Sequence, residues 1–290
     1  EHIEQAGIHS GDSACSLPPY SLSNGVLDEM RRQVKLMAKE LNVVGLMNAQ
    51  LAYQDDEIYV IEVNPRASRT IPFVSKATGV ALANIAVRAM TGISLKEQGF
   101  IKEVIPKHFS VKESVFPFNK FLGVDPYLGP EMRSTGEVMG VGHDFPSACD
   151  KAFLAAGDII PTSGKVFVSL RTLDRERLVE LGERLNNQGF EIVATRTNQE
   201  ILQNAGLECT MVNKVSEGSP HIVDLVKNDE ISLIISSTED TQGLEDAAVI
   251  RCQALVHKVP CMTTVAAAFA TLDGLKTHDK MIVRSLQSLH

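Results

Sequence analysis

From Gly157 onward the chain alternates short apolar segments with amphipathic ones, and this alternation limits the possible folds more than any other feature. Each apolar segment spans four or five residues, a usual length for a strand that is buried on both faces. Buried strands that alternate with helices predict a parallel sheet covered by helices, an α/β architecture. The expected strands are residues 166–170, 191–194, 209–212, 233–236 and 260–263. The expected helices are residues 174–187, 199–205, 222–227, 244–257 and 265–272.

Residues 1–114 follow a different pattern, which predicts a helix, an antiparallel hairpin and a second helix. The helices are expected because apolar side chains recur at three- and four-residue spacing. The hairpin is expected because two runs with strand character flank the polar turn at residues 54–57. The expected helices are residues 24–42 and 80–90, and the expected strands are residues 46–53 and 58–64.

Residues 115–156 are rich in glycine and proline and form a connector between the two halves. The segment is too apolar for a flexible linker, so we expect it to pack under both halves. This division gives three parts: residues 1–114, a connector over residues 115–156, and a terminal domain over residues 157–290.

One strand of the expected hairpin, with the residues after it, carries polar side chains suited to chemistry. Glu62 and Asn64 are two residues apart, so in a strand they project to the same face. Their hard oxygen atoms suit Mg²⁺, which usually takes one or two protein ligands together with nucleotide phosphates. Arg66 and Arg69 follow within seven residues of Glu62, and arginine matches the planar oxygen face of a phosphoryl group. The run therefore predicts a phosphoryl-transfer site.

The bulk properties exclude several classes of protein. A net charge of −8, the absence of Trp and the lack of basic runs argue against a nucleic-acid surface. No apolar run reaches the roughly 18 residues that cross a bilayer, so we expect no membrane contact. Five scattered cysteines without a CxxC pair argue against a disulfide framework or a zinc site and favour the cytoplasm.

Three segments together resemble the large subunit of carbamoyl-phosphate synthetase: Glu1–Ser13 (EHIEQAGIHSGDS), Glu62–Thr70 (EVNPRASRT) and Gly129–Gly142 (GPEMRSTGEVMGVG). The resemblance covers the whole chain and points to the carboxy-terminal portion of that subunit. It implies the end of the second ATP-grasp unit, an α+β domain, followed by the connector and a methylglyoxal-synthase-like parallel-sheet α/β domain. Because the chain starts at Glu1 inside a motif, we expect a fragment of a longer protein.

The resemblance implies an ATP-dependent ligase with allosteric control. The parent would phosphorylate carbamate, made from bicarbonate, to give carbamoyl phosphate for pyrimidine and arginine biosynthesis. The implied cofactors are ATP and two Mg²⁺ or Mn²⁺ ions, with K⁺ as a further candidate. The implied partners are a glutamine amidotransferase small subunit, the effectors UMP, IMP or ornithine, and a second copy bound through the terminal domain. We expect this fragment alone to be inactive, because it lacks the amino-terminal lobe of the site.

The resemblance also assigns roles to individual residues. Arg69 would stabilise the transferred phosphate, with Arg66 as a second candidate. The expected metal ligands are Gln50, Glu62 and Asn64, and the expected nucleotide contacts are Gly7, Ile8, His9, Ser10, Gln50 and Glu62. Gln50 can share a face with Glu62 only if the hairpin opposes them. That pairing needs an odd-length loop or a bulge, because a four-residue loop would turn Gln50 to the other face.

Two effector sites are implied as well. The family places acids around ornithine, and the matching residues are Glu4, Asp12, Glu113 and Thr263. Cys261 stands where the enteric family pattern has a tyrosine. A nucleotide monophosphate site is implied at the carboxyl ends of the terminal strands, where such sheets bind ligands. Its expected residues are Arg175, Thr195, Asn198, Lys214, Ser236 and Thr238.

Two other functions fit parts of the same pattern. The chain could be a nucleotide-binding regulatory or oligomerisation module without turnover. It could also be an active methylglyoxal synthase, since the terminal fold is shared. That enzyme needs a glycine-rich phosphate turn after its second strand, whereas residues 194–198 here contain no glycine. The ligase fragment with an allosteric module is therefore the leading hypothesis.

Overall fold

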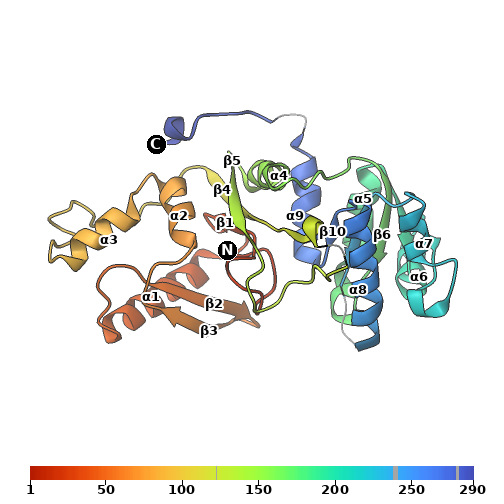
Figure 1. Cartoon of the computed structure of the whole chain (residues 1–290), viewed down its shortest axis with the longest axis horizontal. Coiled ribbons are helices and arrows are strands. Elements are labelled where there is room, and N and C mark those ends of the chain that lie inside the picture. Colours follow the sequence, from red (N-terminus) through yellow and green to blue (C-terminus); the bar gives the residue numbers. More distant parts are fainter. Residues whose placement is uncertain (122, 238–240, 279–280) are drawn as a thin grey trace.

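A computed structural model describes residues 1–121, 123–237, 241–278 and 281–290 and shows a terminal domain built on a parallel sheet (Figure 1). The five strands run in the order β10-β9-β6-β7-β8, and every described pair is parallel. The predicted α/β architecture of the terminal domain is thus confirmed. The strands are β6 (Gly164–Ser169), β7 (Phe190–Ala194), β8 (Thr210–Met211), β9 (Leu233–Ser236) and β10 (Cys261–Met262).

Side chains of the central strands alternate between two hydrophobic clusters, one on each face of the sheet. Val166 and Val168 of β6 join one cluster with α5 and α9, while Phe167 joins the other with α7 and α8. The period of two follows from strand geometry and explains why the strands read as continuous apolar runs. The helices are α5 (Leu178–Asn187), α6 (Arg196–Asn204), α7 (Ile222–Lys227), α8 (Thr241–Val256) and α9 (Val265–Leu275).

The strand order places a topological switch beside β6. The chain moves from β6 to β7 and β8 on one side, then returns to β9 on the other side of β6. Polar side chains at the carboxyl ends of β6 and β9 therefore surround a crevice, where such sheets bind ligands.

A second, antiparallel sheet joins the start of the chain to the connector. Its order is β1-β4-β5, with β1 at Cys15–Leu17, β4 at Phe109–Val115 and β5 at Gly136–Gly142. The sequence analysis did not predict this sheet, and the expected boundary at residue 114 falls inside β4. Helix α4 (Phe145–Ala156) packs on it so closely that a Cβ at Gly140 would lie 2.1 Å from the Ala148 carbonyl oxygen. The connector does pack under both halves, because α4 also contacts α9.

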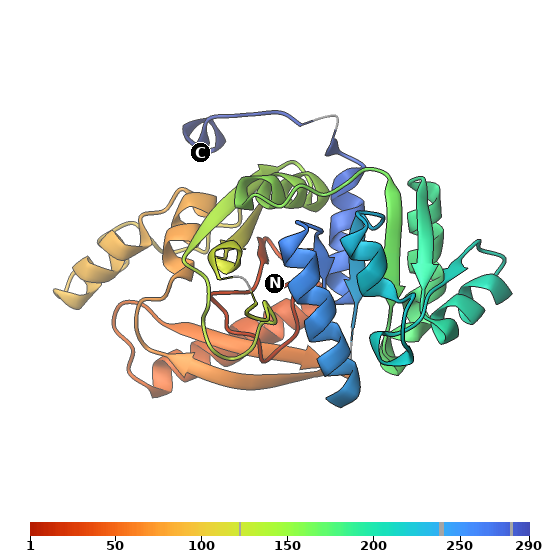
Figure 2. The same cartoon turned by 45° about the vertical axis from the view of Figure 1, so that its right-hand side comes forward.

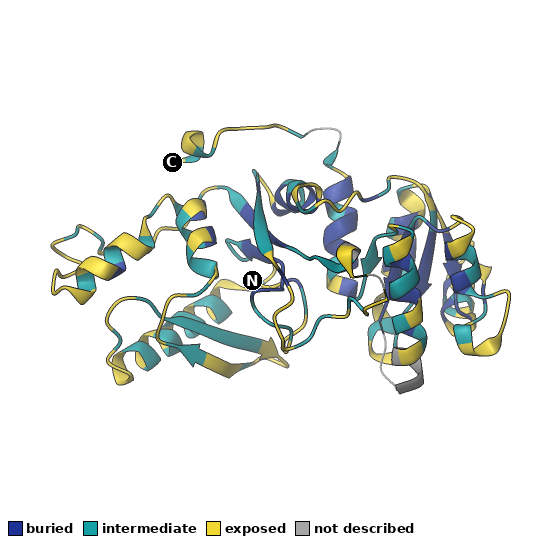
Figure 3. Cartoon of the chain, viewed as in Figure 1, coloured by how far each residue is buried: buried dark blue, intermediate teal, exposed yellow. Residues whose placement is uncertain are grey.

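The remaining part of residues 1–114 is a helix-and-hairpin block, as predicted. It contains α1 (Asn24–Glu40), β2 (Asn48–Gln54), β3 (Glu57–Asn64), α2 (Thr70–Thr78) and α3 (Leu82–Met90). Figure 3 shows that this block is mostly exposed or half-buried, while the buried residues gather in the terminal sheet, α4 and α9. Helix α1 has no buried residue although its sequence is amphipathic.

Several predicted boundaries were wrong for local reasons. The expected turn at residues 54–57 is a two-residue turn, because Gln54 pairs with Glu57 and only Asp55 and Asp56 have positive φ. Helix α2 was not predicted, and Gly79, with φ of 72°, separates it from α3. The expected helix at residues 174–187 starts with a 3₁₀ segment at Thr172–Arg177. Among the described residues, further 3₁₀ segments lie at Phe118–Lys120, Val215–Glu217 and Leu286–Leu289.

Within the described ranges, no single helix has both the length and the apolar character needed to cross a membrane. Helices α2 and α3 reach that length only when taken together, and they meet at a bend of 111°.

Candidate functional site

The hairpin brings the three expected metal ligands onto one face. Gln50 is directly opposed to Glu62, and Asn64 is opposed to Asn48 two residues further along. A register shift between Gln50 and Leu51 creates this pairing; without it Gln50 would oppose Ile61. The Asn64 side-chain amide donates a hydrogen bond of 2.9 Å to the Glu62 carboxylate, so the two side chains lie together. The predicted pairing and its bulge are confirmed.

The two arginines after the hairpin point in different directions. Arg66 is exposed, and its guanidinium donates to the neighbouring Ala67 carbonyl at 3.0 Å. Arg69, at the start of α2, donates from Nη1 to the Ser134 hydroxyl at 3.1 Å and to its carbonyl at 3.3 Å. No described hydrogen bond or ion pair joins either arginine to Glu62. The structure thus attaches Arg69 to the connector.

Ser134 belongs to a buried junction where all three quoted motifs meet. The Asp12 carboxylate accepts the backbone N–H of Arg133 at 2.7 Å and that of Ser134 at 3.0 Å. Asp12 is 1% exposed, so these hydrogen bonds replace its hydration. The motifs at residues 1–13, 62–70 and 129–142 are therefore one three-dimensional unit.

The expected nucleotide loop, Gly7–Ser10, is held against the same junction. The His9 backbone N–H donates to the Gly129 carbonyl at 2.8 Å, and its ring Nδ1 accepts from the Gly11 N–H at 3.0 Å. Lys112 of β4, only 3% exposed, donates to the carbonyls of Ser10 and Gly11. Ile8 and Gly7 complete the turn, with Gly7 at φ of 100°. The connector therefore shapes this loop.

The acids assigned to ornithine divide into two groups. Burial raises the pKa of Glu4 to about 7, although the Ala14 N–H donates to its carboxylate. Burial and the nearby Glu4 charge raise the pKa of Glu113, and one Glu113 oxygen is buried without a hydrogen-bond partner. Asp12, by contrast, already binds the connector backbone. Thr263 lies just after β10, and no described hydrogen bond or ion pair joins it to these acids.

A pocket of about 200 Å³ opens at the carboxyl ends of β6, β7 and β9, beside the topological switch. Five of the six expected nucleotide residues line it: Arg175, Thr195, Asn198, Lys214 and Ser236. The sixth, Thr238, lies outside the described residues. Sequence reasoning missed further polar lining residues from the same strand ends and from α8: Ser169, Arg171, Ser237 and Asp246.

Polar contacts give the pocket wall its shape. Asn198 is 2% exposed, and its side-chain amide accepts from the Leu170 N–H and donates to the Leu170 carbonyl. The same amide nitrogen donates to the Thr195 hydroxyl at 3.1 Å. Arg175 donates from Nε to the same Leu170 carbonyl at 3.3 Å, which leaves its terminal nitrogens for a ligand. The start of helix α6, just after Thr195, adds backbone donors of the kind that bind phosphate. The arrangement suits an anion.

An ion pair between a buried arginine and a partly exposed aspartate connects this pocket to the connector. Helix α8 lines the pocket with Ala247 and Ile250. The next residue, Arg251, is 6% exposed and binds both Asp125 carboxylate oxygens, at 2.8 and 2.6 Å. Its guanidinium also lies 4.7 Å from the Tyr127 ring centroid. The amino-acid sequence did not indicate this ion pair, because its two residues are 126 positions apart.

The hairpin set differs from a metal site built on clustered acidic, histidine or cysteine side chains. In the part of the chain that the structure describes, no group of three or more His, Cys, Asp or Glu residues could hold a metal ion. The hairpin set differs in kind, because it combines one carboxylate with two amides. Those oxygens are hard ligands of the sort that Mg²⁺ takes beside nucleotide phosphates.

Comparison with known proteins agrees with this organisation. Residues 1–98 match the family model "Carbamoyl-phosphate synthase L chain, ATP binding domain", and residues 177–263 match the model "MGS-like domain". Over its full length the chain is 58% identical to the carbamoyl phosphate synthase large chain of Pseudomonas putida. It is 57% identical to that of Halomonas eurihalina and 54% identical to that of Vibrio cholerae. The chain spans 27% of the length of each of these relatives.

A solved methylglyoxal synthase from Elizabethkingia anophelis aligns with 39% of the chain and 79% of its own length. Its sequence identity is 16% and the TM-score is 0.33, a likeness too weak to support a conclusion.

The buried acids predict a pH-dependent stability. Because the folded pKa of Glu4 lies near 7, above its ordinary value of 4.5, the folded state holds a proton that the unfolded state releases. This contribution is fully present below about pH 4.5 and is lost as the pH rises through 7. Urea unfolding at pH 5 to 8 should show Glu4→Gln with a shallower decline than wild type, by up to about 1.4 kcal/mol per pH unit. Glu40→Gln, at an exposed acid, is the control, and equal slopes for wild type and Glu4→Gln would contradict the assignment.

Proposed function

Because the chain belongs to the carbamoyl phosphate synthase large-chain family, we propose that it supplies half of an ATP-dependent ligase site together with a regulatory domain. The reaction would move the terminal phosphoryl group of ATP onto a carbamate oxygen, giving carbamoyl phosphate and ADP. The observation that carries this proposal is the bulged hairpin, since it gathers Gln50, Glu62 and Asn64 on one face. A bulge next to a candidate site is typical of strands that aim functional side chains.

The hairpin residues fit a divalent cation. Glu62 supplies one charge, and the side-chain carbonyls of Gln50 and Asn64 supply neutral oxygens, a set that suits Mg²⁺ or Mn²⁺. When bound, such ions neutralise the phosphate charge and hold the phosphates in place. Glu62 is exposed. This is consistent with a metal ion whose other oxygen ligands would come from the bound nucleotide.

The other residues would position the nucleotide and balance its charge. The Gly7–Ser10 loop offers a fixed turn for the nucleotide, because Lys112 and Gly129 already hold its backbone. Arg69 would balance charge on the moving phosphoryl group, with Arg66 as a second cation. The Arg69 hydrogen bonds to Ser134 connect this cation to the connector.

The rest of the assembly follows from the family. We propose a glutamine-hydrolysing small subunit as the ammonia source, and a role in pyrimidine and arginine biosynthesis. A cytoplasmic setting is favoured by the five cysteines, all of which are free. A nucleotide-binding module without turnover remains the second candidate, because the terminal sheet has a complete core while the hairpin block is open (Figure 3).

The regulatory domain would bind a nucleoside monophosphate, most simply UMP, in the pocket at the strand ends. Lys214 and Arg175 line this pocket and would supply the positive charge, while the Thr195 hydroxyl and the start of α6 would supply directional donors. The effector would reach the ligase half through α8. Ile250 lines the pocket, Arg251 holds Asp125, and the Asp125 carbonyl accepts from the Arg133 guanidinium at 2.9 Å.

Glu62→Gln tests the ligase proposal in a full-length large chain carrying this segment. Replacing the only carboxylate among the three ligands should lower ATP-dependent carbamoyl phosphate formation by about 10²- to 10³-fold. Glu57→Gln, on the same strand at the turn, is the matched control and should stay active. The present chain alone should form no product, because half a site lacks the required preorganisation. Activity near the wild-type level in the Glu62→Gln protein, or metal-dependent turnover by the isolated chain, would contradict the proposal.

Lys214→Ala tests the regulatory proposal on the present chain. Losing a charge-assisted hydrogen bond costs about 1.5–3 kcal/mol, so UMP binding should weaken roughly ten- to a hundredfold in titration calorimetry. Lys227→Ala, an exposed lysine of the same domain, should bind like wild type. Equal affinity in the Lys214→Ala chain, or no binding of any uridine or purine monophosphate at millimolar concentration, would rule the site out.

A further inference from the structure

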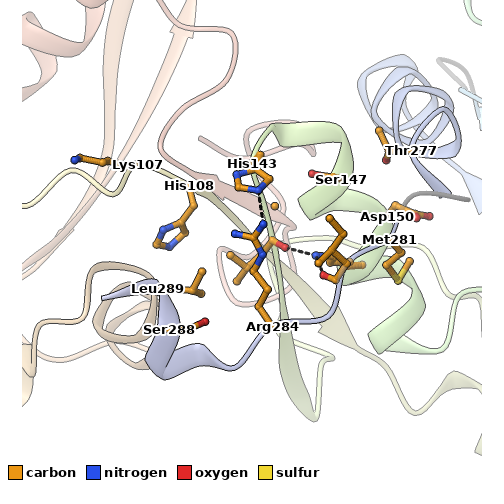
Figure 4. Close-up of a pocket in the computed structure, with 14 residues that line it drawn as sticks. Lys107, His108, His143, Ser147, Asp150, Thr277, Met281, Arg284, Ser288 and Leu289 are labelled. Atoms are coloured by element: carbon orange, nitrogen blue, oxygen red, sulfur yellow. Dashed lines mark hydrogen bonds between the residues drawn. The ribbon is translucent and has the colours of Figure 1, made fainter.

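A second cavity, of about 260 Å³, lies away from both sites described above (Figure 4). It is enclosed by the carboxyl end of β5, the first turns of α4, and residues 107–108 before β4. Residues 281–290, which cross from the terminal domain toward α2, form its remaining wall (Figure 1). The cavity therefore lies between the last segment of the chain and the connector.

Positive charge dominates this cavity although the whole chain carries a net charge of −8. Lys107, Lys151 and Arg284 line it, together with His108 and His143. Its single carboxylate belongs to Asp150, which is buried and contacts the ring of His278 at 3.0 Å. The three cations of the lining, called the basic cluster here, therefore outnumber its carboxylate.

The cations of the cluster are held by neutral groups. Lys151 donates from Nζ to the carbonyls of Val141 at 2.7 Å and Ile282 at 2.6 Å. Arg284 donates from Nη2 to Nε2 of His143 at 2.6 Å, so this ring nitrogen carries no proton (Figure 4). Among the described residues, no carboxylate pairs with Lys107, Lys151 or Arg284. Burial and the nearby Arg284 charge accordingly lower the pKa of Lys151.

His108 adds a buried polar atom that lacks a partner. Its Nε2 is buried and has no hydrogen bond within the described part of the chain. The ring also meets the ring of His290, with centroids 5.8 Å apart, so it lies beside the last segment. A buried ring nitrogen without a partner costs free energy unless a ligand or water satisfies it.

From this arrangement we infer that the cavity binds a small anion of the phosphate type, such as a phosphomonoester, which ties residues 281–290 to α4 and β5. A guanidinium and an ammonium that form no ion pair with the cavity's single carboxylate, Asp150, match the several oxygens of a phosphate group. The apolar side chains of Val141, Met281 and Leu289 leave room beside it for a small organic group. An anion there would bridge Arg284 of the last segment and Lys151 of α4.

The last segment has few other attachments to the connector and the first half of the chain. His290 contacts the Lys76 carbonyl at 2.8 Å through its ring Nε2. In addition, Lys151 binds the Ile282 carbonyl, and Arg284 binds the His143 ring, as described. None of these contacts neutralises charge. A bound anion would therefore add the charge compensation that the present contacts do not provide.

Inorganic phosphate and a simple sugar phosphate are the probes, and the histidine ring resonances in the NMR spectrum of the whole chain are the readout. Either anion should shift the His108 and His143 resonances in a saturable way. Arg284→Gln should weaken this response about ten- to a hundredfold. Arg88→Gln, the same charge change at an exposed residue of α3, should leave it unchanged. If the shifts saturate at a lower concentration of the sugar phosphate than of phosphate, the ligand is an organic phosphate. If they saturate at the same concentration, the ligand is free phosphate.

The strand-end pocket could also bind phosphate, so the titrations are repeated in the Lys214→Ala chain. His221 is the internal reporter for that pocket, because its neighbour Ile222 lines it. Amide hydrogen exchange of residues 285–290 should slow on adding phosphate to wild type and remain unchanged in Arg284→Gln. The inference is overturned if His108 and His143 do not respond, if Arg284→Gln responds like wild type, or if exchange of the last segment does not slow.

Discussion

The loop at residues 125–134 is held at both ends by hydrogen bonds to charged groups, and the relation between the two halves of the chain depends on this. At one end the Asp12 carboxylate accepts two backbone N–H groups, and at the other Arg251 binds both oxygens of Asp125. Hydrogen bonds to a charged group contribute about 1.5–3 kcal/mol each. Removing one partner of a buried ion pair costs about 3–5 kcal/mol, somewhat less here because Asp125 is 35% exposed. The loop is therefore stiffer than its glycine and proline content suggests.

In the proposed function, this loop would connect the ligase chemistry to its regulation. At one end of the loop, Ser134 contacts Arg69. The other end contacts α8, and the turn of α8 just before Arg251 lines the strand-end pocket. The 3₁₀ segment at Phe118–Lys120 packs on α8 as well. Figure 2 shows α8 beside the connector loop in a second view. A continuous series of contacts is necessary for mechanical coupling, but only a response that depends on one of the contacts demonstrates it.

The sequence predicted the terminal sheet well because its strands are buried on both faces and its helices have clear periods. It did not predict the β1-β4-β5 sheet, because β4 buries Lys112 and Glu113 and so does not read as an apolar strand. Helix α2 was missed for a similar reason, since Thr70, Pro72 and Thr78 resemble a loop composition. Tertiary contacts decided these elements where local propensity did not.

Parts of the candidate sites were predictable where a shared ligand requires particular side chains to lie together. The resemblance required Gln50 and Glu62 to converge, which predicted either an odd-length loop or a bulge, and the structure has the bulge. Likewise, the resemblance and the expected strand ends together predicted five of the residues that line the strand-end pocket. Lys112 and the Arg251–Asp125 pair were not predictable, because each joins segments more than 100 residues apart and nothing in one segment specifies its partner.

Hydrogen exchange on the chain with and without saturating UMP tests the central claim, that effector binding reaches the ligase half through Arg251. UMP should slow amide exchange at residues 125–134 and 9–13 in wild type. In Arg251→Met, UMP should still bind by calorimetry but leave exchange in both segments unchanged. Arg251→Lys, which keeps the charge and loses the two-nitrogen contact, should respond partially. The same slowing in Arg251→Met as in wild type would contradict the account.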